Sequence, residues 1–256
     1  MPQERLSCCW VCRLRCSGVS TVGGVAVLVF ERLEIVQEGF RLVADLGVPE
    51  GALAAVIGPS GAGKSTLLGA IAGFVPVTSG RLLWSGVEIT GHSPSARPVS
   101  ILFQDNNLFP HLTAFENVAL GLKPSLRLDA SEREQVVRAL ARVGLEGFDA
   151  RRPAQLSGGQ QTRVALARVL LRARPLLLLD EPFAALGPAL KAEMLALVAE
   201  ICRETGATLL MVTHDMADAE AIASQTLLVA DGQVSGPFAT AALLADPPPS
   251  LRAYLG

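Results

Sequence analysis

The chain has 256 residues, half of them hydrophobic, and a formal net charge of −2, so it is long enough for one large domain or two small ones with a sizeable core. The near-neutral charge excludes a global basic field of the kind that attracts nucleic acid, and no nucleic-acid partner is expected. No apolar run reaches the roughly 18–20 residues that span a bilayer, so attachment to a membrane would need a partner protein.

Residues 1–30 are expected to form an N-terminal extension that is disordered or is extra sequence upstream of the functional start, which we place near residue 28. Four of the five cysteines lie here, at Cys8, Cys9, Cys12 and Cys16. A metal site at the Cys9-x-x-Cys12 pair is the alternative, but no second pair and no nearby histidine completes it. Residues 17–30 resemble the apolar core of a signal peptide without a clear cleavage site. The folded domain is then expected over residues 31–256.

The first part of this domain is predicted to contain short strands separated by glycine turns. We expect strands over residues 33–36, 40–44, 54–57, 81–84 and 87–89. The strand over 54–57 is apolar and reads as buried, whereas the others predict a small antiparallel sheet beside the core that contains it.

A glycine-rich motif directly follows the buried strand and fits the pattern G-x-x-x-x-G-K-[ST]. Its residues are Gly58, Pro59, Ser60, Gly61, Ala62, Gly63, Lys64, Ser65 and Thr66. Leu67, Leu68 and Ile71 then predict the inner face of a helix. Such a loop points successive N–H groups at phosphate oxygens, and the helix N-terminus adds partial positive charge. Lys64 is predicted to reach the β- and γ-phosphates, and the Ser65 hydroxyl to ligate Mg²⁺.

The middle of the chain changes from strands to helices. A strand over residues 98–103 ends at Gln104, and residues 105–165 read as a helical insertion. Ser131 and Glu134 match a capping box, which predicts the start of a helix that ends at Gly144.

Strands alternating with helices return in the last third, which predicts an α/β fold with a mostly parallel sheet. Buried strands are expected over residues 176–180 and 208–212, with a helix between them that ends at Gly206. Asp180 and Glu181 end the first of these strands, beside the expected phosphate site. Asp180 is a candidate Mg²⁺ ligand and Glu181 a candidate general base, and a surface carboxylate pair is the alternative.

A serine followed by two glycines opens a further helix, predicted to run from Gln161 to Arg172, and forms a second anion-binding helix N-terminus. Together these motifs resemble the ATP-binding cassette (ABC) ATPases, a resemblance that runs from about Leu33 to the C-terminus. Its motifs, in order, are the phosphate loop 58–66, Gln104 of the Q-loop, the signature residues Leu156, Ser157, Gly158, Gly159 and Gln160, the Asp180–Glu181 pair, the D-loop residues Ala185, Leu186 and Gly187, and the switch histidine His214.

The resemblance implies a P-loop NTPase core with an N-terminal antiparallel β subdomain and a helical subdomain. It implies a homodimer in which ATP and Mg²⁺ lie between the phosphate loop of one copy and residues 157–160 of the other. His214 would then contact the γ-phosphate, and Gln104 would connect the metal and the attacking water to a membrane permease. The ATPases of the family's importers work at the cytoplasmic face of the inner membrane, and the permease receives an extracellular or periplasmic solute-binding protein on its other side.

Two positions depart from the family pattern. The D-loop usually ends in Leu-Asp, but this chain has Leu186-Gly187, which places communication between the two nucleotide sites in question. The family also stacks an aromatic side chain on adenine ahead of the phosphate loop. Phe40 is the aromatic within reach, although Gln37 lies nearer the usual spacing, and core packing is an equal alternative for Phe40.

Residues 97–109 and 117–122 are similar to the ATPases of bacterial thiamine importers, with Asp105 where those proteins have glutamate. The resemblance therefore implies import of a small solute, with thiamine favoured and iron or polyamines as alternatives. A soluble, non-transport ABC ATPase and a subunit that hydrolyses ATP poorly are the remaining readings. The presence of Glu181 and His214 argues for normal hydrolysis.

Overall fold

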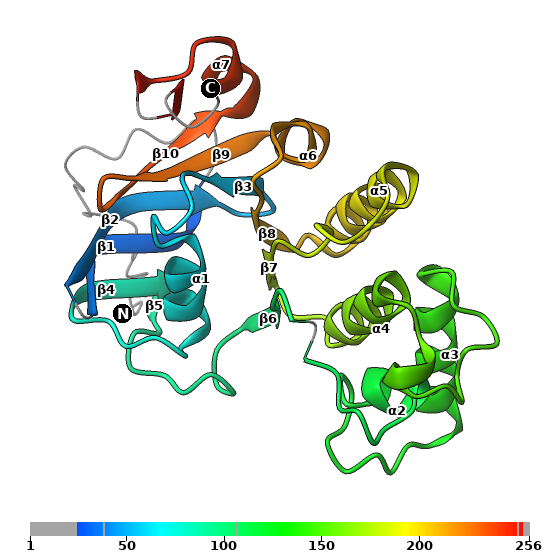
Figure 1. The fold of residues 1–256 in the computed structure, drawn as a ribbon. Coiled ribbons are helices and arrows are strands. Elements are labelled where there is room, and N and C mark those ends of the chain that lie inside the picture. Colours follow the sequence, from blue (N-terminus) through cyan, green and yellow to red (C-terminus); the bar gives the residue numbers. More distant parts are fainter. Residues whose placement is uncertain (1–24, 38, 106, 250, 253–256) are drawn as a thin grey trace, which may run out of the picture.

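The computed structural model describes residues 25–37, 39–105, 107–249 and 251–252. Within them one ten-stranded sheet curls around helix α1, and the remaining helices lie outside the curl (Figure 1). The strand order is β5-β4-β1-β2-β10-β9-β3-β8-β7-β6. The strands are β1 (Ala26–Gln37), β2 (Phe40–Pro49), β3 (Leu53–Ile57), β4 (Ser79–Trp84), β5 (Val87–Glu88), β6 (Val99–Leu102), β7 (Leu176–Asp180), β8 (Thr208–Val212), β9 (Gln225–Ala230) and β10 (Gln233–Ala239). The α-helices are α1 (Lys64–Ala72), α2 (Ala114–Ala119), α3 (Ala130–Arg142), α4 (Gly158–Leu171), α5 (Pro188–Thr205), α6 (Met216–Ile222) and α7 (Thr240–Ala245).

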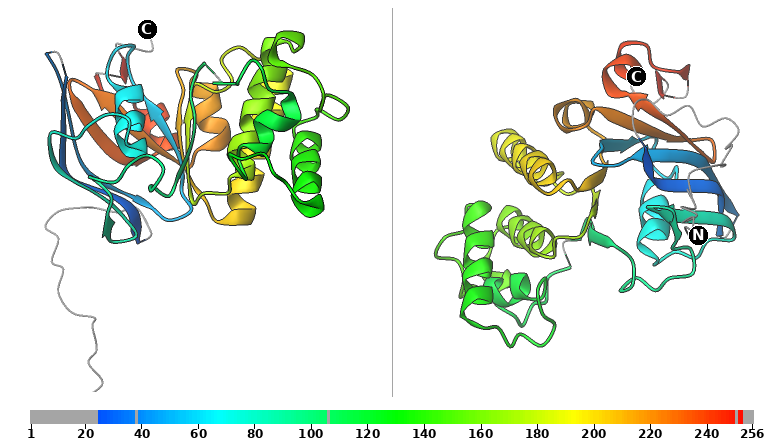
Figure 2. Two further views of the ribbon diagram at one scale, coloured as in Figure 1. Left: turned by 90° about the horizontal axis from the view of Figure 1, so that it is seen from below. Right: turned by 180° about the vertical axis from the view of Figure 1, so that it is seen from behind.

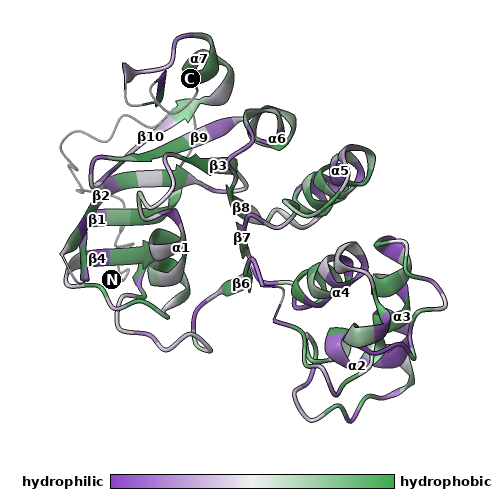
Figure 3. Ribbon diagram, in the orientation of Figure 1, coloured by the Kyte–Doolittle hydropathy of each residue, from purple (hydrophilic) through white to green (hydrophobic). Residues whose placement is uncertain are grey.

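The parallel strands of the sheet are buried on both faces. Because side chains alternate along a strand, Leu176 and Leu178 of β7 join the inner core around α1, whereas Leu177 and Leu179 join the outer core beneath α2 to α6. The continuous apolar sequence of such strands reflects this double burial. All residues of β7 and β8 are buried, and Figure 3 colours these strands by their hydropathy. The predicted parallel α/β sheet is therefore confirmed.

The antiparallel strands are present but are not a separate sheet. β1 pairs with β2 and β4, as predicted for this region, and all three continue beyond the predicted bounds. β2 then pairs in parallel with β10, and β10 pairs with β9. Strands β9 and β10 were not among the strands predicted from the sequence. They join the antiparallel part to β3, the strand before the phosphate loop, in one sheet.

The predicted start of the folded domain at residue 31 is too late. β1 begins at Ala26, and Leu28 and Phe30 are buried in the inner core. These residues pair with β2 and β4, so they belong to the sheet. Residues 1–24 of the predicted extension, which include the cysteine cluster, lie outside the described residues.

Helices α2, α3 and α4 occupy the segment predicted to be a helical insertion, and α4 continues to Leu171, beyond the predicted limit at 165. The predicted capping box at Ser131 and Glu134 is wrong. The N-cap is Asp129, whose side chain accepts a hydrogen bond from the Glu132 N–H while the Glu132 carboxylate accepts one from the Asp129 N–H. The pairs Asp129–Glu132 and Ser131–Glu134 both match the capping-box pattern. Glu132 also forms an ion pair with Lys123 at 2.6 Å. This tertiary contact favours the earlier helix start.

A buried arginine fixes the far end of α1, the helix that follows the phosphate loop. Arg97 is 2% exposed, and its guanidinium donates hydrogen bonds of 2.6 and 2.8 Å to the carbonyl oxygens of Ala70 and Ile71. It also donates to the carbonyl oxygens of Thr90 and His92. A cation at a helix C-terminus satisfies the last carbonyls and interacts favourably with the helix dipole. Arg97 therefore holds α1 in place against the loop before β6.

Replacing Arg97 with methionine is expected to lower the free energy of unfolding by about 3 kcal/mol, because it leaves buried carbonyl oxygens without donors. Urea denaturation measures the change. Arg81→Met is the matched control, since Arg81 forms an exposed ion pair with Glu31 and its loss is expected to cost less than about 1 kcal/mol. Equal effects of the two substitutions would contradict this role for Arg97.

Candidate nucleotide-binding site

The glycine-rich loop has the backbone conformation that the sequence motif predicts. It joins the end of β3 to α1, and Gly58, Gly61 and Gly63 have φ angles of 151°, 77° and 98°. L-residues with side chains rarely adopt such positive values. A Cβ atom on Gly58 would also lie 2.0 Å from the Val229 carbonyl oxygen. The loop therefore combines close packing on β9 with a curled backbone of the kind that surrounds anions.

Lys64 begins α1, and its side chain folds back over the loop. Its ammonium group donates hydrogen bonds of 2.8 and 2.9 Å to the carbonyl oxygens of Gly58 and Pro59. The residue is 7% exposed. Burial lowers the pKa of Lys64 from its ordinary value, and the nearby carboxylates of Glu181 and Asp180 oppose this shift. The loop thus contains a buried cation directed at the space that its own backbone encloses.

The structure brings two of the predicted metal ligands together. Asp180, at the end of β7, is 7% exposed and accepts a hydrogen bond from the Ser65 hydroxyl. Burial raises the pKa of Asp180, while Ser65 and Lys64 lower it. Carboxylate and hydroxyl oxygens are the donor types that Mg²⁺ prefers, so this pair fits a magnesium ion beside the phosphate loop.

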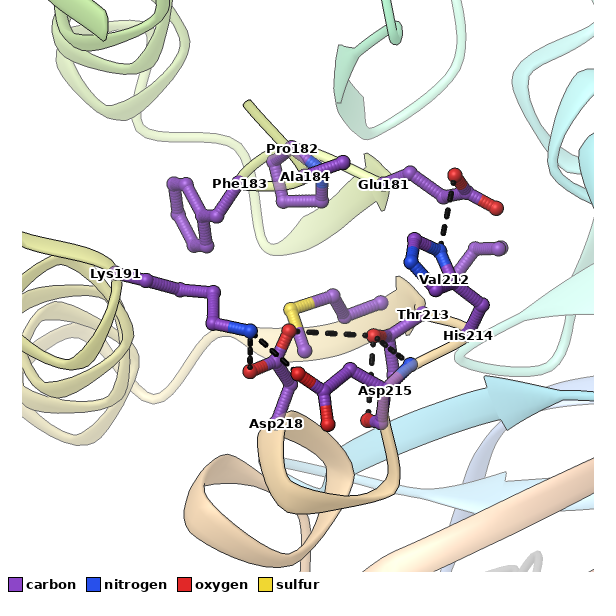
Figure 4. A pocket seen from close by; sticks show the side chains of 11 residues that line it. Glu181, Pro182, Phe183, Ala184, Lys191, Val212, Thr213, His214, Asp215 and Asp218 are labelled. Atoms are coloured by element: carbon purple, nitrogen blue, oxygen red, sulfur yellow. Dashed lines mark hydrogen bonds and ion pairs between the residues drawn. The ribbon is translucent and has the colours of Figure 1, made fainter. Parts of the chain in front are cut away.

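Glu181 and His214 face each other across the ends of β7 and β8 (Figure 4). Their strands are neighbours in the sheet, with Asp180 opposite Val212. The His214 Nδ1 atom lies 3.3 Å from the Glu181 carboxylate. Glu181 has a φ of 46°, which is uncommon for a non-glycine residue, and its N–H donates to the Val212 carbonyl oxygen. The turn after β7 therefore directs the Glu181 carboxylate towards the switch histidine.

Gln104 lies at the same edge of the sheet. β6 runs parallel to β7, with Leu102 opposite Leu179, so Gln104 leaves its strand level with the carboxylate pair. Its side chain is exposed. The structure thus places the Q-loop residue at the open side of the site rather than inside it.

The signature residues begin a helix on the other side of the sheet. The Ser157 hydroxyl accepts a hydrogen bond from the Gln160 N–H, and the Gln160 amide oxygen accepts one from the Ser157 N–H. α4 therefore starts at Gly158, three residues before the predicted start at Gln161. Its buried residues belong to the outer core, whereas those of α1 belong to the inner core. The two helices lie on opposite sides of strands β6 to β8 (Figures 1 and 2).

One chain therefore does not bring the signature residues to its own phosphate loop. Ser157 and Gly158 are exposed, and a Cβ on Gly158 would meet no atom within 4 Å. The neighbouring Gly159 packs against the D-loop, where a Cβ would lie 2.9 Å from a Leu186 methyl carbon. The N-terminus of α4 thus packs against the D-loop at Gly159 and is exposed at Ser157 and Gly158.

The two departures from the family pattern have clear structural settings. Gly187 is the N-cap of α5, with a φ of −66° and no atom within 4 Å of an added Cβ, so its backbone does not require glycine. Phe40 begins β2, and its ring packs on the loop itself, because a Cβ on Gly63 would lie 2.3 Å from the Phe40 Cζ atom. Phe40 also packs against the inner core.

Comparison with known proteins identifies the family. The model of the family described as ABC transporter matches residues 43–184, more than half of the chain. The chain belongs to the ABC transporter family. The match includes the phosphate loop, the Q-loop residue, the signature and the Asp180–Glu181 pair, in the order expected from the sequence.

Curated ABC relatives cover most of the chain. A protein of Cereibacter sphaeroides named thiamine import ATP-binding protein ThiQ is 62% identical over 90% of this chain and 100% of its own length. The protein of the same name from Ruegeria sp. is 58% identical over the same shares. That of Salmonella typhimurium is 55% identical over 74% of this chain and 81% of its own length.

Solved ABC structures share the fold. One is a dimer of the ATP-binding cassette MJ0796 in a post-hydrolysis state bound to ADP and phosphate. It has a TM-score of 0.75 and 29% sequence identity, and the match covers 83% of this chain and 98% of that one. A second dimeric structure of MJ0796 gives the same values.

Replacing Gly58 with alanine is expected to destabilise the chain by more than about 3 kcal/mol, because the new Cβ would overlap the Val229 carbonyl in a conformation that is already strained. Thermal or urea unfolding measures the loss. Gly86→Ala is the control, since Gly86 also has a positive φ of 77° but no atom within 4 Å of an added Cβ, and about 1 kcal/mol is expected there. Equal losses would show that packing against Val229 contributes nothing.

Proposed function

We propose that this chain is the ATP-hydrolysing subunit of an ABC importer and that it works as a homodimer. The observation that carries the proposal is the convergence of Lys64, Ser65, Asp180, Glu181 and His214 at one edge of the sheet. These side chains supply a cation for phosphate, oxygen ligands for a metal, and a carboxylate directed at a histidine. Family membership supports the same activity.

Each residue has a role that its position supports. The N–H groups of loop 58–66 and the Lys64 ammonium bind the phosphates. Ser65 and Asp180 would hold Mg²⁺, and Gln104 would reach that ion from the open side of the site. When bound, that ion neutralises charge on the phosphate oxygens. Glu181 accepts a proton from the attacking water, and His214 binds the γ-phosphate. Phe40, on the surface of the loop, is the proposed contact for adenine.

The nucleotide site is completed by a second copy. Ser157, Gly158, Gly159 and Gln160 lie at an exposed helix N-terminus on the opposite side of the sheet from their own phosphate loop. A head-to-tail arrangement places them on the nucleotide of the other subunit, where the helix N-terminus attracts the γ-phosphate. The dimeric structures of MJ0796 support this arrangement.

We further propose that the dimer is held at the cytoplasmic face of the inner membrane by a permease, which also receives a solute-binding protein on its outer side. Among the described residues, no helix is long and apolar enough to cross a membrane. The helical subdomain that begins after Gln104 is the proposed permease contact. The proposed solute is thiamine, which relatives at 55–62% identity carry in their names.

Glu181→Gln is expected to lower ATP turnover at least roughly a hundredfold, because the amide cannot accept the proton of the attacking water. ATP binding is expected to remain, since the Lys64 and loop contacts are unchanged. Steady-state phosphate release and equilibrium binding of ATP measure the two quantities. Unchanged turnover would remove Glu181 as the general base.

Uptake in the native host tests the solute. Deletion of the gene for this chain is expected to abolish accumulation of labelled thiamine when thiamine is supplied at nanomolar concentration, because a permease without its ATPase has no energy source. The wild-type chain restores uptake, and Glu181→Gln does not. Labelled iron and polyamine are measured in parallel, and loss of either in place of thiamine would reassign the solute. Normal uptake of all three would contradict an importer role.

A further inference from the structure

A cluster of charges lies behind His214, on the two helices that follow the candidate site. The Lys191 ammonium donates to the Asp215 carboxylate at 2.5 Å and lies 2.8 Å from the Asp218 carboxylate (Figure 4). Lys191 belongs to the first turn of α5, and the two aspartates to the N-cap and first turn of α6. The cluster therefore joins α5 to α6.

The position of Lys191 explains why these partners are needed. A cation in the first turn of a helix is repelled by the positive end of the helix dipole, whereas carboxylates in that position are favoured. Lys191 is only 22% exposed, and Asp218 only 13%. Hydrogen bonds with Asp215 and then Asp218 raise the pKa of Lys191, and Lys191 lowers the pKa of Asp215. The ion pair thus favours the charged forms of both Lys191 and Asp215.

The cluster fixes the residues on both sides of His214. On one side, Asp215 donates its N–H to the Thr213 hydroxyl, and its carboxylate accepts the Ala217 N–H at 3.0 Å. On the other side, Thr213 is buried, and its N–H donates to the carbonyl oxygen of Val56 in β3. The backbone at His214 is therefore held between the phosphate-loop strand and the Lys191 ion pair.

The Lys191–Asp215 and Glu181–His214 contacts connect the same two segments of the chain. From Glu181 the chain passes through residues 182–187 into α5, where Lys191 binds Asp215. His214 precedes Asp215 and lies 3.3 Å from the Glu181 carboxylate. The Lys191–Asp215 ion pair thus connects the helix that follows Glu181 to the residue that follows His214.

We propose that Lys191 is a positioning residue for ATP hydrolysis: by holding Asp215, it keeps His214 against Glu181 and couples the switch histidine to the D-loop helix. This inference rests on the proposed ATPase function. Lys191 contacts the carboxylates of Asp215 and Asp218, and it acts on the reaction through His214.

Lys191→Met is expected to lower kcat roughly tenfold, with the KM for ATP within about twofold of wild type, because His214 is displaced while the phosphate loop is intact. Lys191→Arg restores most of the rate, since guanidinium can hold both carboxylates. Asp215→Asn keeps the N-cap but loses the charge that binds Lys191, so its kcat is expected to fall as far as that of Lys191→Met. Arg138→Met is the control, because it removes a cation from an exposed pair within α3 and leaves kcat unchanged.

A double substitution separates positioning from simple loss of stability. If Lys191 acts through His214, adding Lys191→Met to His214→Ala causes no further loss of kcat per ATP-binding subunit. A further tenfold loss in that background, or wild-type kcat in Lys191→Met alone, overturns the proposal. Measuring Glu181→Gln in the same assay distinguishes a failure of the Lys191 positioning role from a failure of the proposed ATPase function. If Glu181→Gln is inactive and Lys191→Met is fully active, only the positioning role fails.

Discussion

The phosphate loop depends on the double burial of β3. This strand lies between β9 and β8 in the middle of the sheet, and its residues alternate between the inner core, with Ala54 and Val56, and the outer core, with Ala55 and Ile57. Both cores would have to repack for the strand to move, and close-packed interiors resist such shifts. Gly58 continues the strand directly into the loop and packs on β9. The packing of both cores and of Gly58 therefore holds the loop backbone in its curled form.

The same sheet also separates the two anion-binding helix N-termini. α1 packs in the inner core and α4 in the outer core, so the sheet lies between the phosphate loop and Ser157 of one chain. In the proposed homodimer, each chain therefore supplies two half-sites rather than one complete site. Contact between the half-sites of two copies would then complete each nucleotide site. Gly187 is exposed at the start of α5 and lies close in sequence to Glu181. In the proposed homodimer, a subunit contact at Gly187 would be connected to His214 through Lys191.

The motif residues could be predicted from sequence because their geometry is local. The phosphate loop needs only a strand, glycines and a helix, and Asp180 and Glu181 directly follow a strand of four leucines. Helix starts were less predictable. Asp129 and Ser131 both have glutamate three residues later, and the helix begins after Asp129, where Glu132 also forms an ion pair with Lys123.

Long-range features could not be derived from local patterns. β10 contains Pro237, and proline within a run argues against a strand; its pairing with β2 and β9 is a long-range contact that joins the two parts of the sheet. Arg97 hydrogen-bonds to carbonyls 26 and 27 residues earlier in the chain. Lys191 pairs with Asp215, which is 24 residues away on another helix. Only the fold brings these groups together.

The most direct test of the composite site is a structure of the Glu181→Gln chain with ATP and Mg²⁺. The account predicts a two-fold dimer in which the Ser157 hydroxyl of each subunit lies within hydrogen-bond distance of the γ-phosphate bound by Lys64 of the other. A monomer with ATP on its phosphate loop, or a dimer in which Ser157 faces solvent, would contradict it.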